Sequence, residues 1–365
     1  MRVGIIGGGQ LGMYLVDAAH VLGHTTVVLD PSSDGPATQN SDIYICGDYD
    51  DPGCLKQLAM QSDVITYEFE NVKAKVIDYL IENFDVKIPQ GKKPLLISQH
   101  RIREKKSLNN VGIKTAEISS LLKKEDLETM KHERNYPYII KTCSGGYDGK
   151  GQWLIKNDDD FSSFKEDYQE SIQYIGEAMV DFACEISIIA VRNELGDIVT
   201  YDAIENIHQH GILHLSISPA RIDETIQSKA KQVARQMMEQ LDFVGIVAVE
   251  MFVGKDGLIY VNEIAPRPHN SGHLTIDSYD PSQYINAILA ITTGDIKEAK
   301  RVKDSVMVNI LGQHLNTVMN KTLPDNAVLY LYGKKESKEN RKMGHITFTG
   351  KCIEEMIEQA EAALK

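Results

Sequence analysis

Residues 244–273 read VGIVAVEMFVGKDGLIYVNEIAPRPHNSGH, and this stretch decides how the chain is expected to fold. Two apolar, β-branched runs, Ile246–Phe252 and Leu258–Ile264, flank a glycine-bounded turn, which predicts an antiparallel hairpin. Each run carries one glutamate, Glu250 or Glu263, and the four-residue turn places the two roughly opposite each other. A carboxylate in a buried strand is costly unless a cation pairs with it, so the hairpin predicts a magnesium site.

The segment around the second glutamate is polar as well. Asn262 stands directly before Glu263, and Arg267, His269 and Asn270 follow in a loop broken by two prolines. Two edge-strand glutamates that face water are the ordinary alternative. The facing carboxylates, the asparagine and the Arg-Pro-His-Asn loop together favour magnesium binding over that alternative.

The bulk composition limits the class of protein. A length of 365 residues predicts two or three domains, and 42% hydrophobic with 25% charged residues is typical of a soluble protein. The net charge of −13, without a basic stripe, argues against nucleic acid as a partner but leaves phosphorylated small molecules open. Five scattered cysteines without a CxxC pair indicate reduced thiols. Since no signal-peptide pattern and no membrane-spanning apolar run occur, we expect a cytoplasmic protein without a membrane partner.

The order of strand and helix signals predicts an α/β protein with three parts. Strands and helices alternate over residues 1–96, which predicts a doubly wound parallel sheet. Its expected strands are Val3–Ile6, Thr26–Leu29, Ile43–Cys46, Val64–Thr66 and Val86–Ile88. A small unit follows, and long antiparallel strands come after Val180. We expect an N-terminal substrate-binding domain at 1–98, a linker helix with a lid at 99–180, and a C-terminal domain at 181–365.

The N-terminal glycines form a G-x-G-x-x-G motif. Gly7–Gly12, read GGGQLG, follows a strand and opens a helix, and Asp30 ends the next strand, as in dinucleotide-binding sites. Amides at a helix N-terminus favour an anion, which could be a phosphate of any ligand. A nicotinamide-dependent oxidoreductase and a plain strand–helix turn both remain alternatives.

A second glycine-rich segment, KTCSGGYDGKGQW at 141–153, is more specific. Lys141 ends a strand, and four glycines lie between Gly145 and Gly151. Such a loop can fold its amides over phosphates while lysines neutralise them, and it suits a lid that closes over a nucleotide. An ordinary hairpin turn needs fewer glycines, so we favour a functional loop.

Four further segments give weaker signals. The crossover at 176–185 could bind adenine and ribose, although solvated glutamates are the commoner explanation. The loop NIHQHG at 206–211 is a modest candidate for part of a binding site. Its two histidines do not predict a zinc site, because no third ligand is evident. Glu68 follows a parallel strand and is favoured over Glu70, which could simply start a helix. Cations at 333–335 and 341–342 could clamp a phosphate monoester, whereas a solvated basic loop is the default.

Taken in order, these motifs resemble the ATP-grasp superfamily and, within it, the 5-(carboxyamino)imidazole ribonucleotide synthetases, carboxylating ligases of purine biosynthesis. The resemblance rests on GGGQLG, TYEFENV, KTCSGGYDGKGQW, NIHQHGIL, EMFV…YVNEIAPRPHNSGH and YGKK…RKMGHI, and it runs from residue 1 to beyond residue 345. It implies an ATP-grasp fold with a pre-ATP-grasp N-terminal domain, a small α+β lid and a mainly antiparallel α+β C-terminal domain. It also implies ATP, bicarbonate and aminoimidazole ribonucleotide as substrates, Mg²⁺ with Mn²⁺ as a substitute, and a homodimer.

The resemblance also assigns roles to single residues. The implied ATP contacts are Arg101, Lys141, Gly146, Tyr147, Asp148, Gly149, Lys150, Gly151, Gln152, Glu177, Ala178, Met179, Val180, Glu185, His208, Asn262 and Glu263. Glu250 and Glu263 match the metal ligands, and Arg267, His269 and Asn270 match the bicarbonate and carboxyphosphate contacts. The implied ribonucleotide contacts are Gly9, Gln10, Leu11, Glu68, Tyr147 and Asp148, with Lys334 and Arg341 on the 5′-phosphate. Asp148 is the candidate to orient or deprotonate the amine.

The chain departs from the family at Glu339-Asn340, where a Pro-Gly pair is usual. The resemblance therefore carries over the charge of this basic loop but not its conformation. An ATP-grasp ligase with another acceptor, of the formate-dependent glycinamide ribonucleotide transformylase or biotin carboxylase type, is one alternative. A non-catalytic nucleotide-binding regulator is another.

Overall fold

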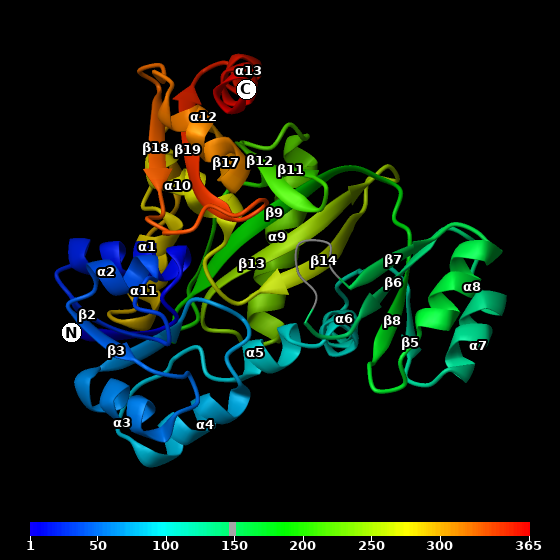
Figure 1. Cartoon of the computed structure of the whole chain (residues 1–365), viewed down its shortest axis with the longest axis horizontal. Coiled ribbons are helices and arrows are strands. Elements are labelled where there is room, and N and C mark those ends of the chain that lie inside the picture. The colour runs from blue at the N-terminus through cyan, green and yellow to red at the C-terminus, as the bar shows by residue number, and fades with distance from the viewer. Residues whose placement is uncertain (146–150) are drawn as a thin grey trace.

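The structure is a computed structural model of the chain, and it describes residues 1–145 and 151–365 (Figure 1). Its strands form a parallel four-stranded sheet, an antiparallel four-stranded sheet, a large nine-stranded sheet and one two-stranded pair. The parallel sheet and its helices lie at lower left in Figure 1, the small antiparallel sheet lies at right, and the large sheet runs between them. This arrangement agrees with the three parts expected from the sequence.

The N-terminal sheet has the order β3-β2-β1-β4 with all strands parallel. Its strands are β1 (Arg2–Ile6), β2 (Thr25–Asp30), β3 (Ile43–Cys46) and β4 (Val64–Tyr67), and its helices are α1 (Gln10–Val21), α2 (Pro36–Asn40), α3 (Pro52–Gln61) and α4 (Ala74–Asn83). Alternate strand residues face opposite sides, so Val3 and Ile5 pack with α1 whereas Ile6 packs with α3 and α4. Both faces are therefore covered, as a doubly wound sheet requires.

One expected strand of this sheet is absent among the described residues. The prediction of a strand at Val86–Ile88 is wrong, because only Lys87 pairs with the sheet, through a single parallel bridge to Val64. Pro89 follows at once and has no N–H to continue a ladder.

The second part begins with two linking helices, α5 (Lys93–Ser98) and α6 (Arg101–Asn110). An antiparallel sheet of order β5-β8-β6-β7 follows, made of β5 (Ile118–Leu121), β6 (Tyr138–Thr142), β7 (Gln152–Ile155) and β8 (Tyr174–Ala178). The helices α7 (Glu125–Glu133) and α8 (Asp158–Asp167) cover it. Its own core is aromatic, with Phe161, Phe164 and Tyr174 buried together, so this part packs as a separate unit.

The nine-stranded sheet runs β14-β13-β9-β11-β12-β17-β19-β18, with β10 also paired to β9. The strands are β9 (Phe182–Arg192), β10 (Ile198–Thr200), β11 (Ile204–Gln209), β12 (Ile212–Ser218), β13 (Gly245–Gly254), β14 (Ile259–Ala265), β17 (Asp304–Leu311), β18 (Ala327–Leu331) and β19 (Lys342–Gly350). The helices are α9 (Glu224–Gln240), α10 (Thr275–Ser278), α11 (Gln283–Ile291), α12 (Leu315–Met319) and α13 (Ile353–Leu364). The short elements are β15 (Tyr279–Asp280), β16 (Lys300–Arg301) and the 3₁₀ turns η1 (Asn270–Leu274) and η2 (Gly312–His314).

Helices from different parts of the chain cover the two faces of this sheet. Ala230, Ala234 and Met237 of α9 pack against one face. On the other face, α11 packs against α1 of the N-terminal part, where the rings of Tyr14 and Tyr284 lie 5.1 Å apart. The sheet is thereby joined to the N-terminal domain through a shared core. No described helix has both the length and the apolar character needed to cross a membrane.

Candidate active site

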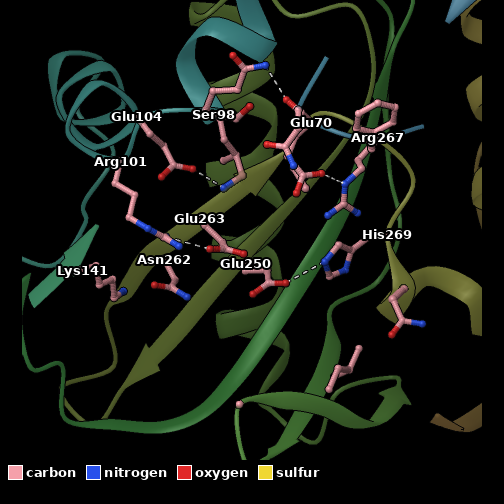
Figure 2. A pocket seen from close by; sticks show the side chains of 18 of the residues that line it. Glu70, Ser98, Arg101, Glu104, Lys141, Glu250, Asn262, Glu263, Arg267 and His269 are labelled. Atoms are coloured by element: carbon pink, nitrogen blue, oxygen red, sulfur yellow. Dashed lines mark hydrogen bonds and ion pairs between the residues drawn. The ribbon is translucent and has the colours of Figure 1, made fainter. Parts of the chain in front are cut away.

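A cavity of about 680 Å³ lies where the three parts of the chain meet. Figure 2 shows acidic and basic side chains from several elements pointing toward one another around it. Of the residues predicted for the site, those that line the cavity are Gly9, Gln10, Leu11, Glu68, Arg101, Lys141, Gly151, Gln152, Glu185, His208, Glu250, Asn262, Glu263, Arg267, His269 and Asn270. Among the predicted residues that the structure describes, those that do not line it are Glu177, Ala178, Met179, Val180, Lys334 and Arg341. Five predicted residues lie outside the described part of the chain: Gly146, Tyr147, Asp148, Gly149 and Lys150.

The predicted hairpin is present, and its two glutamates face each other. Glu250 of β13 pairs with Glu263 of β14 in the antiparallel register. The next pair is Met251 with Val261, so Asn262 is an extra residue in β14 and forms a β-bulge. A bulge re-aims side chains, and both Asn262 and Glu263 line the cavity although they are consecutive in a strand.

These residues fit a magnesium ion. Proteins usually hold Mg²⁺ with one or two carboxylates and leave the remaining positions to substrate phosphates and water. Glu250, Glu263 and Asn262 supply oxygen donors of this kind within one part of the cavity (Figure 2). In residues 1–145 and 151–365, no group of three or more His, Cys, Asp and Glu side chains gathers as a metal site. Two carboxylates and one amide leave coordination positions for phosphate and water, so the donor set suits a cation that a bound phosphate helps to hold.

Glu250 has a direct partner in His269. The imidazole Nε2 lies 2.9 Å from Glu250 Oε1. The backbone N–H of Ser271 donates to His269 Nδ1 at 3.3 Å, so Nε2 is the nitrogen that donates toward Glu250. Burial raises the pKa of the Glu250 carboxyl, but the hydrogen bond and charge of His269, with nearby Arg267, outweigh burial and lower the pKa. Glu250 is thus held as the anion that a cation site needs.

Arg267 is held by Glu70, a residue that the sequence analysis ranked below Glu68. The Arg267 Nε donates to Glu70 Oε2 across two parts of the chain, and both residues line the cavity (Figure 2). Burial raises the pKa of Glu70, but the charge of Arg267 outweighs burial and lowers the pKa. The position of Glu70 just after the parallel strand β4 was the signal for it, and its pairing was not visible in the sequence.

Asn270 is fixed by a second buried amide. Asn270 Nδ2 donates to Asn309 Oδ1 at 3.0 Å, and Asn309 Nδ2 donates back to Asn270 Oδ1 at 2.7 Å. Asn309 lies on β17, far along the chain from the hairpin. This pairing fixes the orientation of the Asn270 amide at the cavity wall.

Two cations predicted for the phosphate side carry acidic partners. Arg101 Nη1 lies 3.2 Å from Glu263 Oε2, and Lys141 Nζ lies 2.6 Å from Glu177 Oε2. Burial lowers the pKa of Lys141, and Glu177 opposes this shift. Glu177 of β8 pairs with Lys141 of the neighbouring strand β6, and of these two side chains only that of Lys141 lines the cavity. Met179 follows with its side chain exposed.

Residues 206–209 belong to a strand and only His210 and Gly211 form a turn, so the prediction of a loop over 206–211 is wrong for its first four residues. Residues 204–209 form β11, which pairs with both β9 and β12, and its register shifts between Ile207 and His208. His208 Nδ1 lies 3.0 Å from Glu185 Oε2, and both residues line the cavity. The polar sequence IENIHQ hides this strand, because its alternation carries few apolar residues.

The N-terminal glycine loop binds carboxylates of its own chain. Gly9 N–H donates to Glu68 Oε1 at 2.5 Å, and Gly12 N–H donates to Glu68 Oε2 at 2.6 Å. Gly8 N–H donates to Asp30 Oδ2 at 2.7 Å. A dinucleotide would have to displace the Glu68 carboxylate from the helix N-terminus, and Asp30 is already engaged where a ribose would need it. The interpretation as a nicotinamide site is therefore not supported.

The basic loop between β18 and β19 lies over α1 and α2 (Figure 1). Lys334 Nζ donates to the Lys342 carbonyl at 2.9 Å. Burial and the charge of Arg341 lower the pKa of Lys334 to about 8, while Glu68 opposes this shift. Arg341 is exposed and donates to the Glu336 carbonyl at 2.9 Å. Lys342, the first residue of β19, lines the cavity, and no described residue of the loop itself does.

Family models match all three parts of the chain. A ribonucleotide synthetase preATP-grasp domain matches residues 1–99, an ATP-grasp domain matches 106–284, and a phosphoribosylaminoimidazole carboxylase C-terminal domain matches 305–359. These matches confirm the predicted fold class, including the doubly wound N-terminal sheet.

Three similar proteins have closely related names. The N5-carboxyaminoimidazole ribonucleotide synthase of Bacillus subtilis is 41% identical over 358 residues, which cover 98% of this chain and 93% of the relative. The Staphylococcus aureus enzyme in complex with ADP has a TM-score of 0.93 at 37% identity, covering 100% of this chain and 97% of that one. The Aspergillus clavatus enzyme in complex with ADP and 5-aminoimidazole ribonucleotide has a TM-score of 0.90 at 29% identity, covering 100% and 98%. The chain belongs to the family of N5-carboxyaminoimidazole ribonucleotide synthases, as the sequence motifs predict.

Proposed function

We propose that this chain is an ATP-dependent carbon–nitrogen ligase of de novo purine biosynthesis. It carboxylates 5-aminoimidazole ribonucleotide with bicarbonate, by way of carboxyphosphate, and releases 5-(carboxyamino)imidazole ribonucleotide, ADP and phosphate. The observation that carries this proposal is that one cavity is lined by the two facing glutamates, by Glu68, and by three residues of the following loop, Arg267, His269 and Asn270. One reaction with three substrates needs one chamber of this kind.

The first step activates bicarbonate. Bicarbonate is a poor electrophile, so one of its oxygens attacks the γ-phosphorus of ATP, and the bond to ADP breaks. Catalysis of such a transfer is mainly positioning and charge neutralisation. We assign Lys141 and Arg101 to the phosphates, and Arg267, His269 and Asn270 to bicarbonate and the carboxyphosphate formed from it.

Magnesium belongs to the same step. We assign Glu250 and Glu263 as its ligands, with Asn262 beside them, and when bound the ion would neutralise phosphate charge. Manganese, which also accepts oxygen donors, is expected to substitute for it.

The second step forms the carbon–nitrogen bond. The amine of the ribonucleotide attacks the carbon of carboxyphosphate, or of carbon dioxide released from it, and phosphate leaves. The amine loses a proton, for which Asp148 is our candidate. Because carboxyphosphate hydrolyses readily, the lid segment that carries Gly151 and Gln152 has the task of excluding water.

The remaining assignments concern binding. We assign Gly9, Gln10, Leu11, Glu68 and Tyr147 to the ribonucleotide, with Lys334 and Arg341 at its 5′-phosphate. The nucleotide assignment covers Gly146–Gln152, Glu177–Val180, Glu185 and His208. We also propose the domain boundaries 1–98, 99–180 and 181–365, a homodimer and a cytoplasmic location.

The test is a coupled phosphate-release assay in which each substrate is omitted in turn. We expect phosphate release to require ATP, bicarbonate and the ribonucleotide together. Glycinamide ribonucleotide with formate, and biotin with bicarbonate, serve as substituted acceptors. Turnover with either of these but not with aminoimidazole ribonucleotide would overturn the proposal, as would binding of ATP without turnover of any acceptor.

A further inference from the structure

The strand that carries Glu263 lies at an edge of the large sheet. β14 has β13 on one side, and on the other it has no strand among the described residues, only an isolated parallel bridge between Val261 and Thr115. Backbone groups on such an outer edge need other partners, because unpaired N–H and C=O groups are costly when buried. The Val261 N–H donates to the Lys114 carbonyl at 2.8 Å, and the helix α6 supplies the partners for the Asn262 carbonyl and the Ile264 N–H.

Two adjacent charged residues of α6 bond the backbone on either side of Glu263. Lys105 Nζ donates to the Asn262 carbonyl. The Ile264 N–H donates to Glu104 Oε1 at 2.7 Å, and Figure 2 shows the Glu104 side chain. The bonds therefore bracket the bulge from outside. Arg101, one turn earlier on the same helix, reaches the Glu263 carboxylate itself.

Both side chains are deeply buried. The exposed fractions of the Lys105 and Glu104 side chains are 1% and 2%, and their charged groups lie 3.6 Å apart. A buried ion pair contributes little to stability compared with apolar residues of the same volume, because two charges have to leave water. This pair nevertheless satisfies one carbonyl and one N–H that an apolar pair would leave unbonded. Its chemistry is suited to holding a backbone in one conformation.

We propose that Glu104 and Lys105 are positioning residues that hold the β14 bulge so that Glu263 and Asn262 face Glu250 at the metal site. The register of β13 and β14 alone does not fix a bulge, since two residues on one strand oppose a single residue on the other. The side-chain bracket fixes the outer backbone groups of Asn262 and Ile264, and thereby the direction of the Glu263 side chain between them. This inference rests on the proposed function in that it takes Glu250 and Glu263 as the metal ligands.

The variants follow from the contacts. Lys105→Met keeps the length of the side chain but removes the donor to the Asn262 carbonyl, and Lys105→Arg retains a cationic donor. The double variant Glu104→Gln with Lys105→Met also removes the unpaired buried charge, so it isolates the lost hydrogen bond from charge burial. Lys106→Met is the matched control, because Lys106 is the next residue of the same helix and is exposed.

Two measurements separate positioning from simple stability. The first is Mn²⁺ affinity by electron paramagnetic resonance in the presence of a non-hydrolysable ATP analogue. Loss of residues that orient metal ligands typically costs about 10–100-fold in metal affinity. We expect such a loss in Lys105→Met and in the double variant, recovery in Lys105→Arg, and no change in Lys106→Met. Affinity for the nucleotide analogue in EDTA should stay within about twofold throughout, since the bracket acts through the metal ligands.

The second measurement is amide hydrogen exchange over residues 259–265 in metal-free protein. We expect faster exchange in Lys105→Met, with helix α9 unchanged. Unchanged Mn²⁺ affinity in the Lys105 variants overturns the inference if Glu263→Gln does weaken Mn²⁺ binding. If Glu263→Gln binds Mn²⁺ as the wild type does, the proposed metal site fails instead. Amide hydrogen exchange then decides whether Glu104 and Lys105 hold the bulge, and a wild-type exchange rate in Lys105→Met would overturn that inference.

Discussion

Lys334 should lose its hold on the ribonucleotide as the pH rises through about 8. Burial and the charge of Arg341 lower the pKa of its ammonium group to about 8. A lysine loses its charge as pH rises through its pKa, so a protonated fraction near nine-tenths at pH 7 falls to about one-tenth at pH 9. A phosphate monoester has its second pKa at about 6 and keeps its double charge over this range. Between pH 7 and pH 9, therefore, only Lys334 changes its charge in this contact.

The assay is the pH dependence of kcat/KM for the ribonucleotide, since this ratio reports groups of the free enzyme. We expect a decrease of about tenfold between pH 7 and pH 9 in the wild type. Lys334→Arg should abolish this decrease, because a guanidinium stays charged. Lys334→Ala should raise the KM for the ribonucleotide much more than the KM for ATP.

Lys335 provides the control on the same loop. Its side chain is 71% exposed and pairs with Asp34 at the surface. Lys335→Arg should therefore keep the alkaline decrease. The same decrease in kcat/KM for ATP, or its persistence in Lys334→Arg, would refute the assignment of Lys334 to the 5′-phosphate.

Three further predictions concern the cavity and its supporting core. Glu263→Gln should abolish turnover by weakening metal binding while circular dichroism shows an intact fold, and unchanged activity would remove the metal assignment. Glu70→Gln should raise the KM for bicarbonate and lower the free energy of unfolding by about 2 kcal/mol, because Arg267 loses a charged hydrogen-bond partner. Steady-state kinetics measures the first effect and urea unfolding the second. An unchanged KM would limit Glu70 to a structural role. Burial lowers the pKa of His345 to about 3, so its contribution to stability is present above about pH 6.5 and is lost at roughly 1.4 kcal/mol per pH unit between there and pH 3. His345→Phe should reduce the slope of urea-derived stability over pH 5–6.5, where buried His273 keeps a slope of its own because burial also lowers its pKa. An identical slope in the variant would contradict this.

The hairpin could be predicted because its signals are local. Two apolar, β-branched runs and a glycine-bounded turn define β13 and β14, and the turn length then sets Glu250 opposite Glu263. The bulge at Asn262 could not be predicted in the same way. It depends on partners in α6, about 160 residues earlier in the chain.

The glycine loop shows the opposite case, in which a local motif predicted that an anion binds but left the identity of the anion open. Its amides do bind an anion, as a helix N-terminus should. That anion is the Glu68 carboxylate, brought from 56 residues away by the parallel pairing of β1 with β4. Glu70 was ranked too low for a related reason, since its partner Arg267 lies 197 residues along the chain. Long-range pairing decides which of several polar residues reach the site.

Three cations that line the cavity pair with carboxylates of the same chain, and this bears on how the substrates enter. Arg101 bonds Glu263, Lys141 bonds Glu177, and Arg267 bonds Glu70. Isolated charges in such surroundings would be costly, so each one is matched within the chain. On the proposed roles, bound ATP brings both phosphate anions and a divalent cation. We expect Arg101 to exchange Glu263 for a phosphate as the metal takes over that carboxylate, so that every charge keeps a partner during binding. Arg101→Met should therefore weaken ATP binding in the presence of Mg²⁺ less than Lys141→Met does, because it also frees Glu263 for the metal; a larger loss in Arg101→Met than in Lys141→Met would contradict this exchange.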